Sequence, residues 1–464
     1  MLKALARRAR TAWRTVLAAA ALLPARAPAD TLLASYEQAD VGHLVVTSPD
    51  AGLTPTWPLC GTTDPAATAG TCLLKLQWAN EDDKVEVRHD WSDGHTFDLP
   101  GIVAGVAEIR ADVYVASPGA LPQVLGIWDD VFGWSEGWPA PTALNTWTTI
   151  SMYVGDLRDS NNDAYTDLDH IYAVLFEDLP ANHGTLYIDN LRLAPARTLA
   201  FAGRAWSVKH AAHVGPGWNY FSADPEIVWV APEGLHLRIA HRDGRWLCSE
   251  VVGHDSPGYG LYVFTIDTCV AELDPRIVLG LFTWDTYAAA ALPGQDQEID
   301  VEFSRWGDPA KVNAQYVVQP WDQPGNLYRF EVDCVGPTQR TTHTFDWQPD
   351  RISFASYYGD FALVPAEEDV IQRWCYTGGD IPVPDGETVR MNLWLNNPAG
   401  PLDGQDAEVV IADFHYAPSA YAVLINCLTG PSVPAAPDCA AADTEGDTDV
   451  DVHDLAALQT NFPG

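Results

Sequence analysis

Three acidic residues stand at alternate positions in the segment QDQEIDVEFSRW, residues 295–306. They are Glu298, Asp300 and Glu302. Because alternate side chains of a β-strand share one face, this spacing predicts a row of carboxylates on one side of a strand. The apolar residues expected to face a core on the other side are Ile299, Val301 and Phe303.

Carboxylates in such a row repel one another unless a proton, a partner or a substrate offsets the repulsion. Retaining glycoside hydrolysis uses a pair of this kind, one ionised and one protonated, with roughly 5 Å between them. On a straight strand the Cα atoms of Glu298 and Glu302 would lie about 13 Å apart, so we expect the strand to curve or the side chains to lean together. The alternative is an exposed acidic strand, since a chain with 63 acidic residues can show this pattern by chance.

The charge balance excludes two classes of partner. Acidic residues outnumber basic ones 63 to 26, and the formal net charge of −37 would repel nucleic acid and anionic membrane surfaces. The 464 residues also include 18 Trp and 17 Tyr. Flat aromatic rings suit stacking on the apolar faces of neutral sugars, although most of these rings are expected to lie in cores.

The first 29 residues are typical of an export signal. Five basic residues precede a short apolar run at 16–23, and Ala27-Pro28-Ala29 is a small-x-small cleavage site. The run is too short to span a bilayer, and no other window of the chain is apolar enough. We therefore expect a secreted, soluble mature protein that begins near Asp30, rather than an amphipathic N-terminal helix.

Eight cysteines agree with an oxidising compartment. No C-x-x-C and no Cys/His cluster at zinc spacing is present, so the sequence predicts neither thiol catalysis nor a zinc site. Eight cysteines allow roughly 100 connectivities, and proximity in sequence is only a first guide. It favours the pairs Cys60–Cys72, Cys248–Cys269, Cys334–Cys375 and Cys427–Cys439.

The pattern of short β-branched and apolar runs between Pro, Gly and Asp turns predicts an all-β protein. We expect two successive antiparallel β-sandwiches and a short tail with a helix-like segment. The predicted units are a signal peptide at 1–29, a first sandwich at 30–196, a second sandwich at 199–419 and a tail at 420–464.

About 220 residues resemble glycoside hydrolase family 16, the retaining β-glucan-cleaving jelly rolls. The similarity is carried, in family order, by GRWLCSEVV, GYGLYVFTID, VLGLFTWD, QEIDVEF, VNAQYVVQ, HTFDWQPDRI and MNLW. It implies that residues 199–419 form a concanavalin-like catalytic jelly roll. It also implies that Glu298 is the nucleophile, Asp300 the assisting carboxylate and Glu302 the general acid/base. The uninterrupted E-I-D-V-E resembles members that act on mixed-linkage β-1,3-1,4-glucan or xyloglucan, whereas many laminarinases and agarases carry one extra residue there.

The resemblance also implies a substrate-binding set, namely Glu250, Trp284, Asn313, Gln315 and Trp394. Two positions depart from the family pattern. Asp296 stands where a Trp is usual, and Val252 stands where an Arg often follows the acidic position. Both positions contact sugar in the family, so the departures bear on the substrate more than on the mechanism.

The N-terminal sandwich ends in LYIDNLRL and resembles the carbohydrate-binding jelly rolls that flank such enzymes. In those modules an early acidic residue and the Asp of the last strand hold a structural Ca²⁺, which implies Glu37 and Asp189 here. Trp128, Trp134 and Trp138 form either a sugar-stacking surface or internal packing.

The tail segment DTEGDTDVDVHD places oxygen ligands at the spacing of an EF-hand-like calcium loop. The predicted ligands are the side chains of Asp443, Glu445, Asp447, Asp451 and Asp454 and the backbone carbonyl of Asp449. The segment resembles half of a dockerin repeat, although Thr448 replaces the usual Gly and a second complete loop is missing. This favours a calcium-binding or anchoring tail, with a cohesin-like or cell-surface partner, over a solvated acidic end.

Together these features predict a monomeric, secreted, retaining endo-glycoside hydrolase whose substrate is a polysaccharide, with β-1,3-1,4-glucan favoured. A transglycosylase would use the same machinery. Two rival hypotheses are a non-catalytic glycan-binding or surface-attachment protein with the same fold, and a calcium-dependent scaffold.

Overall fold

The computed structural model describes residues 184–419 with gaps at 243, 286–296, 335–339, 363–364 and 385. Between 31 and 177 it describes separate stretches, chiefly strands, and in the tail it describes 427, 434, 439, 442–443, 446–451 and 453–454. The predicted signal peptide and the predicted helix after the calcium loop lie outside these residues. The described residues contain no helix that is long and apolar enough to cross a membrane.

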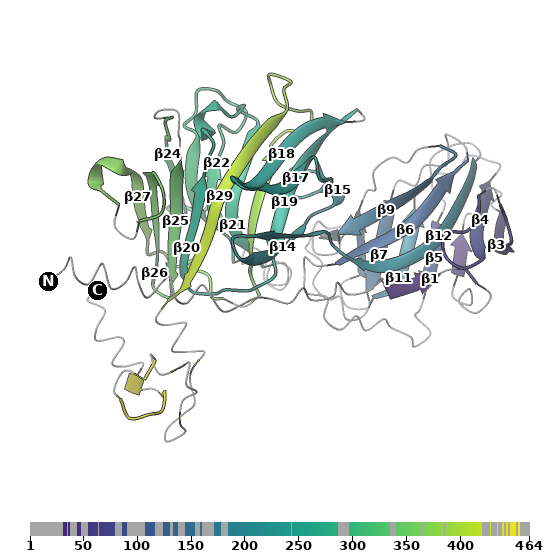
Figure 1. Cartoon of the computed structure of the whole chain (residues 1–464), viewed down its shortest axis with the longest axis horizontal. Helices are drawn as coiled ribbons and strands as arrows, with labels where there is room; N and C mark the ends of the chain where they lie inside the picture. Colours follow the sequence, from purple (N-terminus) through teal and green to yellow (C-terminus); the bar gives the residue numbers. More distant parts are fainter. Residues whose placement is uncertain are drawn as a thin grey trace.

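The chain from 31 to 195 forms two six-stranded sheets (Figure 1). The first contains β3 (Thr54–Cys60), β4 (Cys72–Trp78), β12 (Gly184–Pro195), β6 (Ala107–Val115) and β9 (Trp147–Tyr153), with β1 (Thr31–Ala34) also paired to β12. The second contains β10 (Arg158–Asp159), β8 (Gly133–Gly137), β7 (Val124–Asp129), β11 (Ile171–Glu177), β5 (Glu86–Asp90) and β2 (Leu44–Thr47). Every pairing between these strands is antiparallel.

The strands from 198 to 418 build a jelly roll of two large sheets. One sheet runs β14 (Arg204–Val208), β19 (Arg245–Gly253), β28 (Thr388–Leu395), β21 (Ile277–Trp284), β22 (Ile299–Phe303), β23 (Ala314–Val318) and β24 (Leu327–Phe330). The opposing sheet runs β17 (Val228–Ala231), β18 (Gly234–Arg242), β29 (Ala407–Pro418), β20 (Gly260–Ile266), β25 (Thr341–Gln348), β26 (Arg351–Tyr358) and β27 (Val370–Tyr376).

Shorter elements complete this unit. They are β13 (Thr198–Phe201), β15 (Ala211–Val214), β16 (Asn219–Phe221) and the 3₁₀ turns η4 (Val270–Glu272) and η5 (Glu367–Asp369). The apolar faces of the two large sheets pack on each other, so Val301 and Phe303 of β22 share one core with Tyr262 and Phe345. The all-β prediction with a jelly-roll second sandwich is therefore confirmed. The helical tail stays a prediction, because its helix lies outside the described residues and only His453 and Asp454 are α-helical among the described tail residues.

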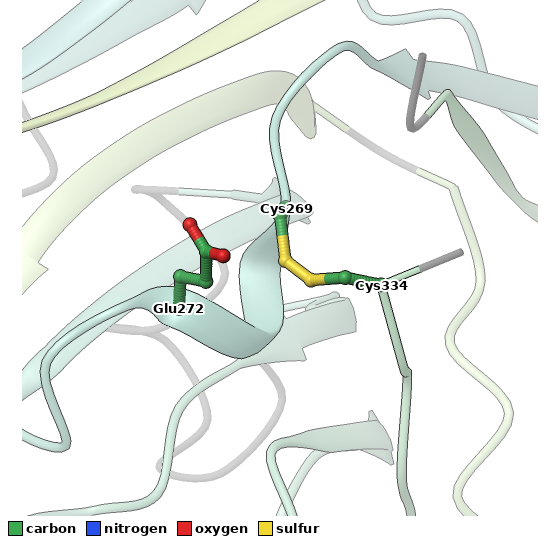
Figure 2. Close-up of side chains that lie close together, drawn as sticks. All are labelled: Cys269, Glu272 and Cys334. Carbon is green, nitrogen blue, oxygen red and sulfur yellow. A yellow bond between two sulfur atoms is a disulfide. The ribbon is translucent and has the colours of Figure 1, made fainter. Parts of the chain in front are cut away.

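Two of the four disulfides expected from proximity are correct, Cys60–Cys72 and Cys427–Cys439. The other two are wrong, because the structure joins Cys269 to Cys334 (Figure 2). Cys269 precedes η4 and Cys334 follows β24, so the fold brings together two chain positions 65 residues apart. Cys248 is a buried free thiol in β19 and Cys375 an exposed one in β27.

Glu272 lies beside this disulfide (Figure 2). Metal ligation by cysteine requires a thiolate, and the two sulfurs here are bonded to each other. The Cys269–Cys334 disulfide therefore links the start of η4 covalently to the segment after β24, and these residues are not a metal site in the disulfide form.

Candidate active site

The carboxylate row lies at and just before strand β22, near the middle of its sheet. The apolar partners Ile299, Val301 and Phe303 are fully buried in the core, so the predicted alternation of faces is correct. Asp300 is buried on the opposite face, Glu302 is half-buried beside it, and Glu298 is half-buried just before the strand begins. The row is thus covered enough to perturb its proton affinities and open enough to reach a ligand.

Backbone register aligns Glu302 with residues of five other strands. Residues directly opposite each other in neighbouring strands project to the same face of the sheet. From β19 to β24 the aligned residues are Glu250, Asn392, Gly280, Glu302, Gln315 and Arg329. This order forms a polar band across the sheet with the acid/base candidate near its centre.

Gly280 keeps the band open. A Cβ atom at this position would come within 2.5 Å of Asn392 Oδ1. A larger side chain between Asn392 and Glu302 would therefore displace the Asn392 amide and fill the space above the sheet.

A cavity that is open to solvent lies over this face. All three carboxylates line it, together with Trp284 and Trp394. Its remaining polar lining comes from Lys209, Glu250, Arg390 and Asn392. The cavity therefore combines charged groups with two indoles, as expected of a site for a sugar chain.

The proton affinities of two carboxylates are raised. Burial raises the pKa of Glu302 to about 7, against the opposing effects of a hydrogen bond from Gln315 and the charge of Arg329. Burial also raises the pKa of Asp300 well above its usual value, and the charges of Glu298 and Glu302 and a hydrogen bond with Glu298 add to that rise. Gln315 Nε2 donates to Glu302 Oε2 at 2.7 Å, and Gln319 Nε2 donates to Asp300 Oδ2 at 3.3 Å.

These shifts give the two groups different chemical abilities. A carboxyl with a pKa near 7 can give up and recover a proton at neutral pH, as a general acid/base must. A protonated Asp300 can donate a hydrogen bond to Glu298, which leaves that carboxylate as the candidate nucleophile.

Glu250 forms the centre of a buried charge cluster at one end of the band. Its carboxylate lies 3.3 Å from Lys209 Nζ and 3.1 Å from Arg390 Nη1, and all three residues are at most 3% exposed. Asn392 Nδ2 also donates to it at 3.3 Å. Glu250 is thus fixed in place beside the cavity with compensating charge.

The departure noted at Val252 has a counterpart on the neighbouring strand. Val252 is fully buried, and Arg390 lies directly opposite it in the register of β28. The Arg390 guanidinium contacts Glu250 and lines the cavity. Arg390 therefore places a guanidinium beside Glu250 from β28, whereas the family pattern predicts an Arg at position 252 on β19. Asp296, the other departure, lies outside the described residues.

The predicted substrate-binding residues divide into two groups. Glu250, Trp284 and Trp394 line the cavity, and Gln315 bonds to Glu302. Asn313 differs, because its amide donates to Val332 O and accepts from Val332 N, both at 2.8 Å. Both of its polar atoms hold the backbone of a neighbouring segment, so we leave it out of the proposed sugar site.

Several residues of this site escaped sequence reasoning, notably Lys209, Gly280, Arg390 and Asn392. Asn392 had a usable signal, since it stands two positions before Trp394 in MNLW and must share its face. Lys209 had none, because it follows β14 and reaches Glu250 across 41 residues of sequence.

A second cavity, also open to solvent, lies next to Glu298. It is lined by Gln297, Glu298, Gln319 and the segment 379–383. Asn326 Nδ2 donates to Asp380 Oδ2 at 2.9 Å, which ties the loop after β23 to this segment. Glu298 thus borders open space both over the sheet and beside the end of β22.

Both carboxylates of the predicted N-terminal calcium pair accept backbone hydrogen bonds. Glu37 accepts from the backbone N–H groups of Thr71 and Cys72, and Asp189 accepts from those of Thr68 and Ala69. These bonds fix the two carboxylates in place, and Ca²⁺ binding at this pair stays a prediction. Trp128 and Trp134 pair in the β7–β8 register, but their side chains and Trp138 are outside the described residues.

The tail brings three carboxylates of the predicted calcium loop together. One carboxylate oxygen from each of Asp449, Asp451 and Asp454 lies within 4.8 Å of the others, and all three residues are buried. Asp443 accepts from the backbone N–H groups of Gly446, Asp447 and Thr448, which closes the loop. An all-oxygen set of this kind fits Ca²⁺.

Thr448 adopts a φ of +82° in this loop. The backbone therefore makes the sharp turn at the position where Gly is usual, although the residue is Thr. Asp447 is exposed in the same loop, and Glu445 lies outside the described residues.

No protein-family model matches the chain, and no curated protein sequence matches it. Solved structures similar to it include a Bacillus licheniformis beta-glucanase, with 19% identity, a TM-score of 0.33, and coverage of 46% of this chain and 92% of that one. A laminarinase from Flavobacterium sp. UMI-01 has 10% identity, a TM-score of 0.34, and coverage of 46% and 92%. A glycoside hydrolase family 16 endo-glucanase from Bacteroides ovatus, in complex with G4G3G-2F-DNP, has 11% identity, a TM-score of 0.33, and coverage of 46% and 94%.

Proposed function

We propose that this protein is a secreted, retaining, endo-acting glycoside hydrolase that cleaves a β-glucan, with mixed-linkage β-1,3-1,4-glucan as the favoured substrate. The observation that carries the proposal is the single cavity lined by Glu298, Asp300 and Glu302. Residues 199–419 would form the catalytic unit, residues 30–196 a carbohydrate-binding unit and residues 420–464 a calcium-binding tail. Three disulfides support an oxidising compartment.

The first half of the reaction would form a covalent intermediate. The Glu298 carboxylate attacks the anomeric carbon, the bond from that carbon to the glycosidic oxygen breaks, and Glu302 gives its proton to the departing oxygen. Asp300, kept protonated by burial and by its two acidic neighbours, donates a hydrogen bond to Glu298 and limits the charge repulsion between the carboxylates.

The second half would release the sugar. Glu302, now ionised, takes a proton from water as the water oxygen attacks the anomeric carbon, and Glu298 departs as a carboxylate. Two displacements at one carbon retain its configuration. An acceptor sugar in place of water would give transglycosylation.

Cleavage within a chain is supported by the open space on both sides of Glu298. One cavity contains Trp284 and Trp394, and the other is bordered by Gln319 and the segment 379–383. Both are open to solvent, so a polymer could extend beyond the carboxylates in either direction.

The direct test is reducing-end release by the full mature chain on barley mixed-linkage glucan, laminarin, xyloglucan, agarose and carrageenan, with the product anomer followed by NMR. We expect cleavage of at least one β-glucan with initial release of the β-anomer. A folded protein that binds one of these glycans and cleaves none would favour the non-catalytic glycan-binding alternative.

The pH dependence is expected to follow Glu302. The protonated acid is required for cleavage, so kcat/KM should fall as the pH rises through about 7. The positive charge of Arg329 favours ionised Glu302, and its removal should raise the Glu302 pKa. Arg329→Gln should therefore move the alkaline limb upward by a few tenths of a pH unit, because Arg329 is exposed and its charge is screened.

Arg329→Lys is the matched control, since it keeps the charge and should leave the limb in place. Added salt should reduce the difference between wild type and Arg329→Gln. A limb that moves downward, or moves equally in both variants, would contradict the assignment of this limb to Glu302.

We also propose that the tail binds one Ca²⁺ through Asp443, Glu445, Asp447, Asp451 and Asp454, together with the backbone carbonyl of Asp449. Isothermal titration of the full mature chain with CaCl₂ should show this site, and the double change Asp447→Asn and Asp451→Asn should weaken it at least about tenfold. Glu37→Gln is the control that separates the tail from the N-terminal prediction. Unaltered titration of the double variant would contradict the tail site.

A further inference from the structure

The side chain of Thr283, in β21, contacts the backbone on both sides of Glu298. Thr283 is fully buried. Its hydroxyl donates to Gln297 O at 2.8 Å and accepts from Ile299 N at 3.2 Å. The carbonyl of Gln297 and the N–H of Ile299 belong to the two peptide groups that flank Glu298, so one hydroxyl fixes both.

This contact stands where the regular ladder between β21 and β22 ends. The register between the two strands runs from Leu279 opposite Phe303 to Phe282 opposite Asp300. The next pair would be Thr283 and Ile299, but Gln297 adopts a φ of +50°, and the chain leaves the extended conformation there. The Thr283 hydroxyl takes the place of the next backbone rung.

The backbone of Glu298 is also held from the β23 side of β22. Gln319, which follows β23, donates its backbone N–H to Glu298 O at 3.2 Å. Its side chain donates to Asp300 Oδ2. Glu298 is thus held from both directions, by a side-chain hydroxyl on the β21 side and by a backbone N–H on the β23 side.

We propose that Thr283 is a positioning residue that sets the aim of the Glu298 carboxylate. The inference rests on the proposed function, in which Glu298 attacks the anomeric carbon. Gln297, directly before Glu298, has a positive φ, which is an unfavourable backbone conformation for a residue other than glycine. Relaxation of Gln297 to a negative φ would move the Glu298 side chain. The Thr283 hydroxyl opposes this rotation because it bonds to Gln297 O and Ile299 N together.

Thr283→Val tests the proposal, because valine keeps the shape and burial of threonine and loses only the hydroxyl. The measurement is the rate at which an activated 2-deoxy-2-fluoro β-glycoside labels Glu298, with the labelled peptide identified by mass spectrometry. We expect labelling and kcat to fall by about 10²-fold, the loss expected for a misplacement of about 1 Å, with KM within about threefold of wild type. Thr283→Ser, which restores the hydroxyl, should recover most of the rate.

Thr344→Val is the matched control. Thr344 is also buried, and its hydroxyl also donates to a backbone carbonyl, that of Ala355, but it lies in the opposing sheet. This variant should label at the wild-type rate. If Thr283→Val does not fold, Thr283→Ala supplies the same loss of hydroxyl with less side-chain bulk.

Hydrogen exchange in residues 297–303 provides a readout that does not need activity. The Ile299 amide should exchange faster in Thr283→Val and at the wild-type rate in Thr283→Ser. Unchanged exchange, or labelling at the wild-type rate by folded Thr283→Val, would overturn the positioning role. A different outcome would overturn the proposed function: the wild type neither cleaves any glycan nor is labelled, while Thr283→Val still exchanges faster than the wild type at Ile299. Thr283 would then support only the local backbone structure.

Discussion

Glu298→Gln is expected to lower kcat by about 10⁴-fold or more while the affinity for glycan changes by no more than a few-fold. The amide has nearly the shape of the carboxylate, so the lining of the cavity is preserved. It cannot form the covalent glycosyl intermediate, because a neutral amide is a far weaker nucleophile than a carboxylate. The variant should therefore bind a glycan that the wild type cleaves.

The same change should leave the protein at least as stable as the wild type. Glu298 raises the pKa of Asp300 by its charge and by a hydrogen bond, which means that the ionised forms of the two groups oppose each other. Removing one negative charge from the row relieves that repulsion, as often happens when an active-site residue is replaced. Thermal unfolding of Glu298→Gln should accordingly begin at the wild-type temperature or above it.

Reducing-end assays, glycan titration and thermal unfolding on one preparation separate these expectations. Glu368→Gln is a suitable control, since Glu368 is an exposed residue of η5 outside the cavity over the carboxylates. Activity of Glu298→Gln within tenfold of wild type would exclude Glu298 as the nucleophile. Loss of glycan binding together with activity would mean that Glu298 holds the substrate rather than attacks it.

The sequence was sufficient to predict which face of β22 carries each residue. A strand repeats every two residues, so the alternation of Glu298, Asp300 and Glu302 with Ile299 and Val301 could place one set on the cleft and the other in the core. The same local rule explains why the all-β architecture was predictable. The close pair Cys60–Cys72 also follows from local structure, because these residues face each other in the β3–β4 hairpin.

Contacts between distant strands were not predictable in this way. Arg390 reaches Glu250 across 140 residues, and Cys269 pairs with Cys334 across 65. Both contacts depend on which strands become neighbours, and alternation within a strand carries no information about its neighbours. The family resemblance predicted Glu250 and Trp394 as site residues. It did not predict the buried side chains of Lys209 and Arg390 beside Glu250.

Thr283 was missed for a different reason. A threonine in an apolar strand is common, because its branched side chain suits the pleated surface. Its role depends on where the β21–β22 ladder stops and on the left-handed angle of Gln297, and neither feature is visible in residue types alone. Asn313 is the opposite case. Its residue type and spacing suggested a sugar-binding side chain, but its amide donates to the backbone of Val332.

Glu302→Ala is expected to lower the rate on polysaccharides by about 10²–10⁴-fold, the contribution typical of general acid–base catalysis. The size of the loss should depend on the leaving group. A glycosyl fluoride departs without a proton, so the first displacement should remain within about tenfold of wild type on that substrate. The alkaline limb near pH 7 should also disappear from the activity that remains, because the group that titrates there has been removed.

The second displacement then gives a specific chemical signature. Without Glu302, water has no base to take its proton, and the glycosyl enzyme should accumulate on Glu298. Azide is already an anion and needs no base, so added azide should restore turnover of the fluoride and release a glycosyl azide of retained configuration. Equal losses on the fluoride and on the polysaccharide, or a failure of azide to form this product, would show that Glu302 supports the site without transferring the proton.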